Sequence, residues 1–237
     1  MNLLTRDRFA RARVAPAARL TALVIDVRYA GGAVAQSLAR QGFAVMLGHT
    51  PCDVDAAARA IGAIATSGGC ALAMEADGDG DTAVMRLLDH AEAVFGHIDV
   101  LVDNGRAEVA SRSAEDELFD RYFGVALRGM MDVVREAAPR LRSGGSIVRL
   151  AGGSIFETPQ TQAWMTPHAA LEWLTRTFAA ELAKYDIRIN AIAPSADCGD
   201  PAIADAVALL LGADGNGCNG QVFDVGAAAL RAIGASA

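Results

Sequence analysis

The chain has 237 residues and a formal net charge of -7, and 52% of its residues are apolar against 21% charged. A chain of this length and composition buries a core without disulfides or metals, which excludes an intrinsically disordered protein. The acidic balance, 28 Asp and Glu against 21 Lys and Arg, disfavours binding to nucleic acid.

Residues 1–19 form a basic leader, in which several arginines face a single acidic residue, Asp7. The leader lacks the continuous apolar stretch of a secretory signal, and no apolar run in the chain approaches the roughly 18 residues of a membrane span. We therefore expect a cytoplasmic protein without a membrane segment, in which residues 20–237 form one domain. An organelle-targeting helix is the alternative interpretation of the leader.

After the leader, short apolar runs alternate with longer stretches of helical period, a pattern typical of βαβ units. Strands are expected at residues 21–26, 44–48, 70–75, 98–103, 146–151, 187–193 and 221–225. Helices are expected at residues 32–41, 54–67, 82–95, 114–141, 168–184 and 203–211. The strands are almost continuously apolar, so we predict a single α/β domain of the Rossmann type, with a seven-stranded, mostly parallel sheet covered by helices on both faces.

Metal binding is not expected from the cysteines or from the acidic loop. The four cysteines lack Cys-x-x-Cys spacing and are interpreted as reduced, small apolar residues: Cys52, Cys70, Cys198 and Cys218. Residues 77–81 (DGDGD) begin like a calcium loop. Thr82 and Leu88, however, stand where such a loop has glycine and a bidentate glutamate, so no metal site is predicted.

Four segments of the chain resemble a known family. The order of the expected strands and helices supports the same resemblance from about residue 20 to residue 227. The four segments are residues 95–104 (FGHIDVLVDN), 169–183 (AALEWLTRTFAAELA), 187–194 (IRINAIAP) and 219–226 (NGQVFDVG). Together they resemble the short-chain dehydrogenase/reductase family. The resemblance implies a doubly wound domain that moves a hydride between a nicotinamide cofactor and an alcohol or carbonyl, using an Asn-Ser-Tyr-Lys tetrad.

The positions that match the tetrad do not carry its residues. The asparagine corresponds to Ala126, the serine to Gly152, the tyrosine to Trp164 and the lysine to His168. Glycine has no hydroxyl, and an indole cannot release and regain a proton near neutral pH. The chain's one lysine, Lys184, has no tyrosine four residues before it. We therefore predict no catalytic residue for the family's usual mechanism.

The segment expected to cradle a dinucleotide is also altered. In residues 24–32 (VIDVRYAGG) the side chains of Asp26, Arg28 and Tyr29 occupy a turn that needs glycine, because the backbone must approach the pyrophosphate there. Residues 48–50 (GHT) offer neither an acid for a ribose nor an arginine for a 2'-phosphate. We predict no cofactor-binding residue on this chain; a phosphate gripped by Arg28 is the alternative.

Three further features concern the expected cofactor and substrate sites. Asp77 matches the family's aspartate beside the adenine ring, and Arg106 stands where the family has glycine, which would narrow a cofactor site. After Pro194 the family carries a long substrate lid, whereas here residues 195–201 lead almost at once into the next helix. Loss of the lid would weaken water exclusion and substrate positioning.

The resemblance also implies that helices 114–141 and 164–184 pair across a two-fold axis in an oligomer. Both tryptophans, Trp164 and Trp173, fall on the second helix, either as interface residues or as plain core. The first hypothesis is therefore a catalytically silent subunit that assembles, for example as a heterotetramer, with an active homologous dehydrogenase such as a hydroxyacyl-CoA dehydrogenase or a ketoreductase. NAD or NADP would bind the partner; a homo-oligomer is the other arrangement.

Two other hypotheses stay open. In the first, the chain is an active NAD(P)-dependent oxidoreductase with a rebuilt site, in which His168, Ser154 and Arg28 supply the acid/base, orienting and phosphate-binding groups. Ser154 as local turn chemistry and His168 as a structural histidine are the simpler interpretations of those residues. In the second, the chain is a non-catalytic ligand-binding or regulatory module.

Overall fold

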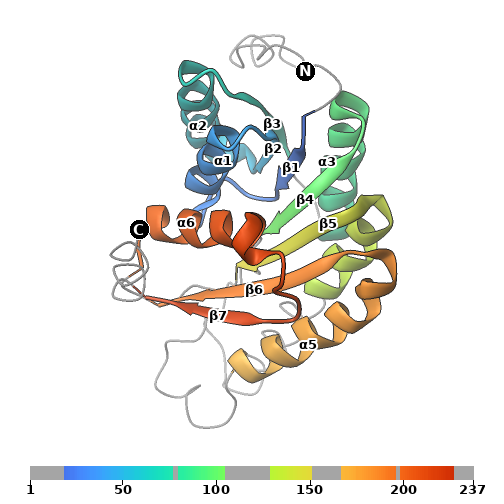
Figure 1. The fold of residues 1–237 in the computed structure, drawn as a ribbon. Helices are drawn as coiled ribbons and strands as arrows, with labels where there is room; N and C mark the ends of the chain where they lie inside the picture. The colour runs from blue at the N-terminus through green and yellow to red at the C-terminus, as the bar shows by residue number, and fades with distance from the viewer. Residues whose placement is uncertain (1–18, 77–79, 105–128, 151–166, 196–197, 227–237) are drawn as a thin grey trace, which may run out of the picture.

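The computed structural model describes residues 19–76, 80–104, 129–150, 167–195 and 198–226 (Figure 1). The basic leader falls outside this part of the chain, apart from its last residue, Arg19. None of the helices that the structure describes has the length and apolar character needed to span a lipid bilayer.

The sheet contains seven strands in the order β3-β2-β1-β4-β5-β6-β7, and every neighbouring pair is parallel. The strands are β1 (Thr21–Val24), β2 (Ala44–His49), β3 (Cys70–Glu75), β4 (Ile98–Asp103), β5 (Leu141–Leu150), β6 (Arg188–Pro194) and β7 (Val222–Val225). The chain moves outward from β1 to β3 and then returns to β4 on the other side of β1. This order is that of a doubly wound fold, with its switch point between β1 and β4.

Helices cover both faces of the sheet, as the continuously apolar strands predict (Figure 1). One face packs against α1 (Gly31–Arg40), α2 (Val54–Thr66) and α6 (Asp200–Leu211). The other packs against α3 (Gly80–Phe95), the helical residues 129–137 and α5 (Pro167–Leu182). The predicted fold class is confirmed.

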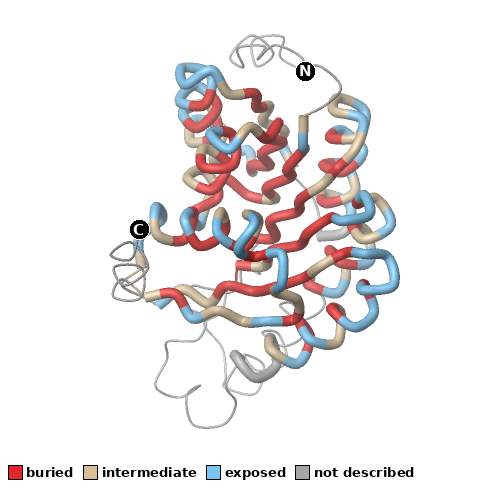
Figure 2. Tube along the Cα trace, viewed as in Figure 1, coloured by how far each residue is buried: buried red, intermediate tan, exposed pale blue. Residues whose placement is uncertain are grey.

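The central strands supply side chains to both layers in alternation. In β1, Ala22 and Val24 belong to the first core cluster, and Leu23 between them belongs to the second. All three are fully buried, in keeping with the buried strands of Figure 2. Burying a side chain such as Leu23 stabilises the fold by roughly 1.5–3 kcal/mol. Because neighbouring residues of β1 are buried in different layers, this short strand stabilises the packing on both faces of the sheet.

Within the described residues, three element boundaries differ from those predicted by three residues or more. The helix expected at 114–141 ends at residue 137 within the described part, because Pro139 cannot continue it, and a single 3-10 turn, Ala138–Arg140, follows. Strand β5 therefore begins at Leu141 rather than at 146. Helix α6 begins at Asp200 rather than at 203, because Pro201 is well suited to a first helical turn.

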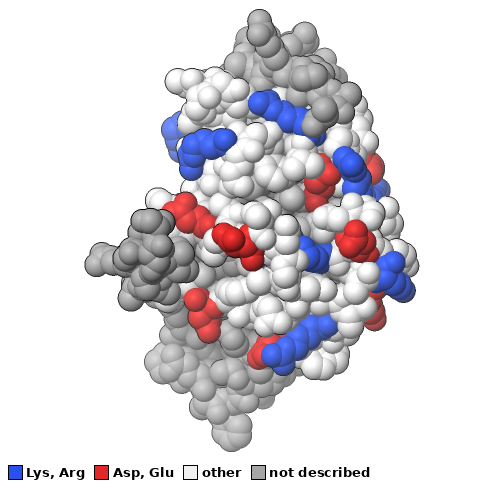
Figure 3. Space-filling model, in the orientation of Figure 1, with Lys and Arg blue, Asp and Glu red and all other residues white. Residues whose placement is uncertain are grey.

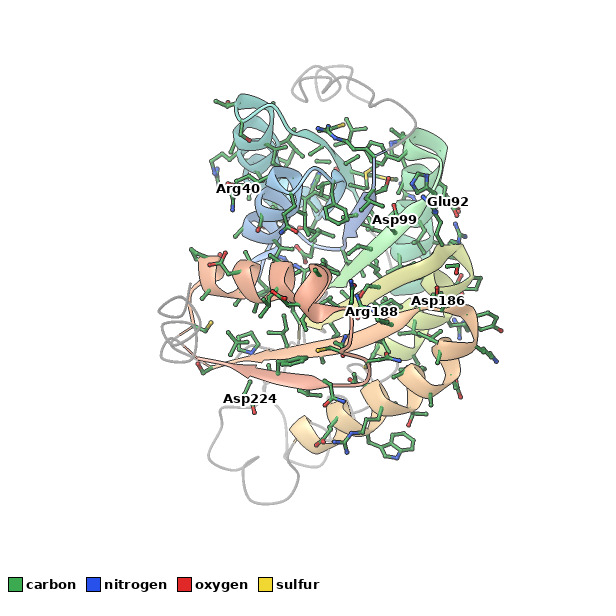
Figure 4. All side chains as sticks on the ribbon, in the orientation of Figure 1. Arg40, Glu92, Asp99, Asp186, Arg188 and Asp224 are labelled. Atoms are coloured by element: carbon green, nitrogen blue, oxygen red, sulfur yellow. The ribbon has the colours of Figure 1, made fainter. Side chains whose placement is uncertain are left out.

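Ion pairs fasten the amino ends of β1, β4 and β5. Asp99 accepts the backbone N–H of Thr21 at 2.7 Å and pairs with Arg142 at 3.4 Å, and its Oδ2 lies 3.2 Å from His97 Nε2. Figure 4 labels Asp99 on β4 and Glu92 on α3, and Arg140 Nη1 lies 3.2 Å from Glu92 Oε2. Nearby, the hydrogen bond from Arg140 to Asp89 raises the pKa of the Arg140 guanidinium.

The described part of the surface carries both signs of charge. On the face shown in Figure 3, Lys and Arg side chains lie interspersed with Asp and Glu side chains. A mixed surface of this kind produces no large field of one sign, so this face offers little attraction to a polyanion.

Candidate functional site

The carboxyl ends of β1, β2, β4 and β5 lie at the edge of the sheet where doubly wound folds bind ligands; we call this edge, with the described loops after β1 and β2, the carboxyl edge. At its centre, Asn104 joins the loop after β1 to the end of β4. The buried Asn104 amide donates to the carbonyl oxygens of Asp26 at 2.6 Å and Arg28 at 2.9 Å, and accepts the N–H of Asp26 at 3.0 Å. Three bonds to one side chain fix the loop across the switch point.

The turn between β1 and α1 is unusual in its backbone. Tyr29 and Ala30 both adopt the left-handed conformation, with φ of 48° and 65°. Such a conformation costs a residue with a Cβ roughly 1–2 kcal/mol, and glycine normally supplies it. Here glycine is instead required one residue later, because a Cβ at Gly31 would lie 1.7 Å from the Asp26 carbonyl oxygen.

The first N–H groups of α1 already have acceptors within this turn. Gly31 donates to the Arg28 carbonyl and Gly32 donates to the Val27 carbonyl, both at 2.8 Å. In a dinucleotide-binding fold the amides at this helix start are the groups that meet the pyrophosphate. In this chain the turn's own carbonyls take two of them.

Three charged side chains, Asp26, Arg28 and Asp53, form an ion-paired group that we call the Arg28 clamp. Arg28 Nη2 lies 2.7 Å and Nε 3.0 Å from Asp26 Oδ2, so the guanidinium makes a forked contact with that carboxylate. Arg28 Nε also lies 3.4 Å from Asp53 Oδ2, which accepts the hydroxyl of Thr50 at 2.5 Å. The clamp therefore connects the loop after β1 to the loop after β2.

The Tyr29 side chain lies beside the clamp. The Arg28 guanidinium lies over the Tyr29 ring, 5.3 Å from its centroid, which is within the range of a cation–π contact. The Asp26 side chain is 10% exposed and the Arg28 side chain 27% exposed. The carboxylate is thus nearly buried, while the guanidinium keeps an edge in solvent.

The end of β2 turns its last side chain inward. His49 is buried, and its Nδ1 lies 2.8 Å from the Thr50 carbonyl oxygen. Gly48 cannot carry a side chain, because a Cβ there would lie 2.0 Å from the Ile25 carbonyl oxygen. The only acidic group brought to the clamp from this part of the described chain is Asp53, which lies beyond the residues 48–50 considered in the sequence.

A second ion pair is buried between β4 and β5. Asp103 and Arg149 are register partners on these neighbouring strands, and Arg149 Nη1 pairs with Asp103 Oδ2. Their side chains are 3% and 13% exposed. Sequence reasoning missed this pair because it shows only once the strand register is known. Asp53 was missed for a similar reason, because its contact with Arg28 joins the loop after β2 to the loop after β1.

Most residues that the sequence assigns to the family's catalytic or cofactor positions, or to a rebuilt site, lie outside the described part of the chain: Asp77, Arg106, Ala126, Gly152, Ser154 and Trp164. His168 lies in the first turn of α5, but its side chain is not among those described. The structure therefore brings together Asp26, Arg28 and Tyr29, but it does not place Arg28 relative to Ser154 or His168.

The predicted short connection after β6 is confirmed, since β6 ends at Pro194 and α6 begins at Asp200.

On the face of the sheet opposite α6, Trp173 of α5 is 66% exposed. Core packing is therefore the wrong interpretation of this tryptophan, at least within the chain itself. Among the described residues, no group of three His, Cys, Asp or Glu side chains is arranged to hold a metal ion.

The comparisons with known proteins agree with this fold. A family model described as enoyl-(acyl carrier protein) reductase matches residues 30–196. The hydroxynaphthalene reductase-like protein Arp2 of Metarhizium acridum is 32% identical over 168 residues, or 69% of this chain and 62% of the relative. The short chain dehydrogenase/reductase AacuN of Aspergillus aculeatus is 30% identical, over 69% of this chain and 63% of its own length. The match thus spans less than two thirds of these curated relatives.

Solved structures extend the similarity to most of the chain. The landomycin C-6 ketoreductase LanV, solved with bound NADP and rabelomycin, superposes with a TM-score of 0.73 at 27% identity, covering 86% of this chain and 94% of LanV. A double mutant of a Serratia marcescens short-chain dehydrogenase/reductase gives a TM-score of 0.74 at 25% identity, covering 88% of this chain and 96% of that one. The structural similarity therefore extends over most of the doubly wound domain.

Proposed function

This chain belongs to the short-chain dehydrogenase/reductase family, and we propose that it is a catalytically silent member that acts as a subunit beside an active relative. Its relatives are oxidoreductases, so the complex would carry out a reductase or dehydrogenase reaction. The active partner would bind NAD or NADP and hold the reacting groups. This chain would supply interface area and shape the partner's substrate entrance.

The observation that carries the proposal is the Arg28 clamp. The Asp26 carboxylate lies nearly buried beside the start of α1, where a dinucleotide would place its negatively charged phosphates. Like charges about 4 Å apart repel by roughly 4 kcal/mol near a protein surface. Arg28 is shared between Asp26 and Asp53, so it compensates only one of the two carboxylates, and the group keeps a negative charge that would repel a phosphate.

The residues at the family's reacting positions support the same conclusion. Trp164 and His168 replace the tyrosine and lysine that hold and move the proton in the family's mechanism. Without a phenol whose pKa is lowered by a neighbouring ammonium group, the carbonyl oxygen would have no proton donor at that position. Gly152 likewise lacks the hydroxyl that would orient the substrate oxygen.

The exposed face of α5 supports the role of a subunit. Trp173 lies on this face beside an ion pair between Glu172 and Arg176, whose closest atoms are 2.5 Å apart. Tryptophan contributes strongly when it is buried at a protein interface, and a large exposed indole is unfavourable in water. We therefore assign the contact with the partner to α5.

A second candidate is an active reductase with a rebuilt site. It is favoured by the reductase names of the relatives and by LanV, a 27% identical neighbour solved with NADP. In this chain Arg28 would bind a cofactor phosphate, and His168 and Ser154 would take the catalytic roles. The clamp would have to open before a cofactor could bind.

Co-expression with each catalytically complete short-chain dehydrogenase of the same organism tests the proposal. We expect the purified chain alone to oxidise no NADPH with ketone substrates, and one partner to co-purify in a fixed ratio with a changed turnover or substrate range. Trp173→Arg should abolish that association and leave the unfolding temperature unchanged, whereas Leu209→Arg, at an exposed position on α6, should have no effect. Turnover by the isolated chain would contradict the proposal.

A further inference from the structure

Arg149 lies near the carboxyl end of β5, beside Asp103 on the neighbouring strand and apart from both loops of the Arg28 clamp. We propose that Arg149 binds the carboxylate of a small organic acid, and that Asp103 holds the guanidinium in the orientation that this binding requires. The inference goes beyond the proposed function and does not depend on it, because it concerns a ligand site on this chain and not the presence of catalysis.

The pair lies on the side of the sheet that α3 and α5 cover. Ile147, two residues before Arg149, belongs to the core cluster on that side, and side chains two apart on a strand share a face. Leu101 is placed in the same way before Asp103. Leu150, which follows Arg149, packs in the cluster on the opposite side. Arg149 thus follows an apolar row, at the edge where open α/β sheets bind ligands.

Arg149 has more hydrogen-bond donors than the surrounding structure uses. A guanidinium carries five N–H donors, and within the described part of the chain only Asp103 is bonded to Arg149, at Nη1. Arg28 and Arg140 each pair with two carboxylates, although their side chains, 27% and 25% exposed, are less buried than that of Arg149, at 13%. No Arg149 nitrogen is a buried atom without a hydrogen-bond partner, so the donors that Asp103 leaves unused reach solvent.

The unused donors have the geometry that recognises a carboxylate. The bond to Asp103 engages Nη1 and leaves Nε and Nη2, which form one edge of the Arg149 guanidinium. Arg28 uses the same two nitrogens to hold the Asp26 carboxylate, at 3.0 and 2.7 Å. A ligand carboxylate would accept two parallel hydrogen bonds from Arg149 in the same manner.

The Asp103 carboxylate favours a singly charged ligand. It compensates the charge of Arg149, so a phosphate dianion would meet a stronger repulsion from Asp103 than a carboxylate would. Stability alone does not account for this pair, because replacing a buried ion pair with apolar residues is often neutral or stabilising. Fixing the guanidinium in one orientation does account for it, since binding then requires less ordering of the side chain.

Isothermal titration with benzoate tests the proposal, with benzamide as a probe of similar shape without charge and inorganic phosphate as a second anion. The variants are Arg149→Lys, which keeps the charge but loses the fork, and Arg142→Lys as the matched control. Arg142 also lies on β5 and pairs with an aspartate of β4, Asp99, but at the amino ends of the strands. Arg28→Ala determines whether benzoate binds at the clamp instead. Thermal unfolding verifies that each variant is folded.

We expect benzoate to bind the native chain with a dissociation constant below about 1 mM, and benzamide to show no saturable heat. Arg149→Lys should weaken the binding of benzoate at least about tenfold, because lysine cannot make the paired hydrogen bonds. Arg142→Lys and Arg28→Ala should leave the affinity for benzoate unchanged.

Three results would overturn the inference: no saturable binding of benzoate, equal binding of benzamide, or a loss in either control variant as large as in Arg149→Lys. Tighter binding of phosphate than of benzoate would overturn the assignment to a carboxylate. If Arg149→Lys unfolds, the double variant Arg149→Gln with Asp103→Asn takes its place, since it removes both charges together, and it should not bind benzoate.

Discussion

The turns at the two ends of the sheet place different kinds of residue in the left-handed conformation. At the amino ends, the turns that lead into the strands place a residue in the left-handed conformation: Gly42, Gly68, Gly96 and Gly220 before four strands, and Asp186 before β6. At the carboxyl edge, the turn after β1 places Tyr29 and Ala30 in that conformation instead. Among the described residues, the turns at the amino ends thus use glycine or, before β6, an aspartate, which tolerates this conformation, whereas the turn expected to cradle a cofactor uses two consecutive residues that do not favour it.

The ion pairs at the two ends of β4 also differ, in how far they are exposed to solvent. Asp99, at the amino end of β4, pairs with Arg142, whose side chain is 56% exposed. Asp103, at the carboxyl end of the same strand, is 3% exposed and pairs with the nearly buried Arg149. At the carboxyl edge, therefore, the charged pair is buried, and removing either partner would leave the other charge buried without compensation.

The largest expected effect comes from breaking that buried pair. Arg149→Ala would leave the Asp103 carboxylate buried without its cation, so we expect the free energy of unfolding to fall by about 3–5 kcal/mol. Urea denaturation measures this change. Adding Asp103→Asn should recover part of the loss, and Arg135→Ala, at a side chain 62% exposed, should cost less than about 1 kcal/mol. A similar small cost at both arginines would remove the distinction between the edges.

A smaller effect is expected at a turn that has kept its glycine. Gly42 has a φ of 96° and no atom within 4 Å of a Cβ built there, so Gly42→Ala tests backbone conformation without a steric clash. We expect the free energy of unfolding to fall by about 1–2 kcal/mol, the cost of left-handed backbone for alanine. An unchanged midpoint in urea would show that the amino-end turns do not depend on glycine.

The smallest effect, of opposite sign, is expected at the altered turn. Tyr29→Gly relieves the left-handed strain but adds chain entropy to the unfolded state and removes the ring below Arg28, so we expect a net stabilisation of about 0.5 kcal/mol. Thermal unfolding at matched pH and salt measures it. A clear destabilisation would mean that the contact with Arg28 outweighs the strain.

The fold could be predicted from the sequence because burial determines it. Continuous apolar runs such as the one containing Leu23 and Val24 can only be strands covered on both faces, and seven of them were recognisable. Boundaries failed where a local residue decided the outcome, as at Pro139, which ends a helix that periodicity alone would continue.

The site was predicted only in part. The crowding of the turn by Asp26, Arg28 and Tyr29 was evident from sequence, because a Gly-rich turn tolerates no such side chains. The contribution of Asp53 and the pairing of Asp103 with Arg149 were not, since both depend on contacts between segments far apart in the chain. The exposure of Trp173 likewise required the packing of α5 to be known.

Titration of the purified native chain with NADPH and NADH tests the central claim most directly, namely that the Arg28 clamp keeps dinucleotides out. Because Asp26 and Asp53 hold the clamp closed, we expect the titration to show no saturable heat, which corresponds to a dissociation constant above about 1 mM. Saturable binding of either nucleotide in the micromolar range, lost on Arg28→Ala, would contradict the claim and favour the active reductase.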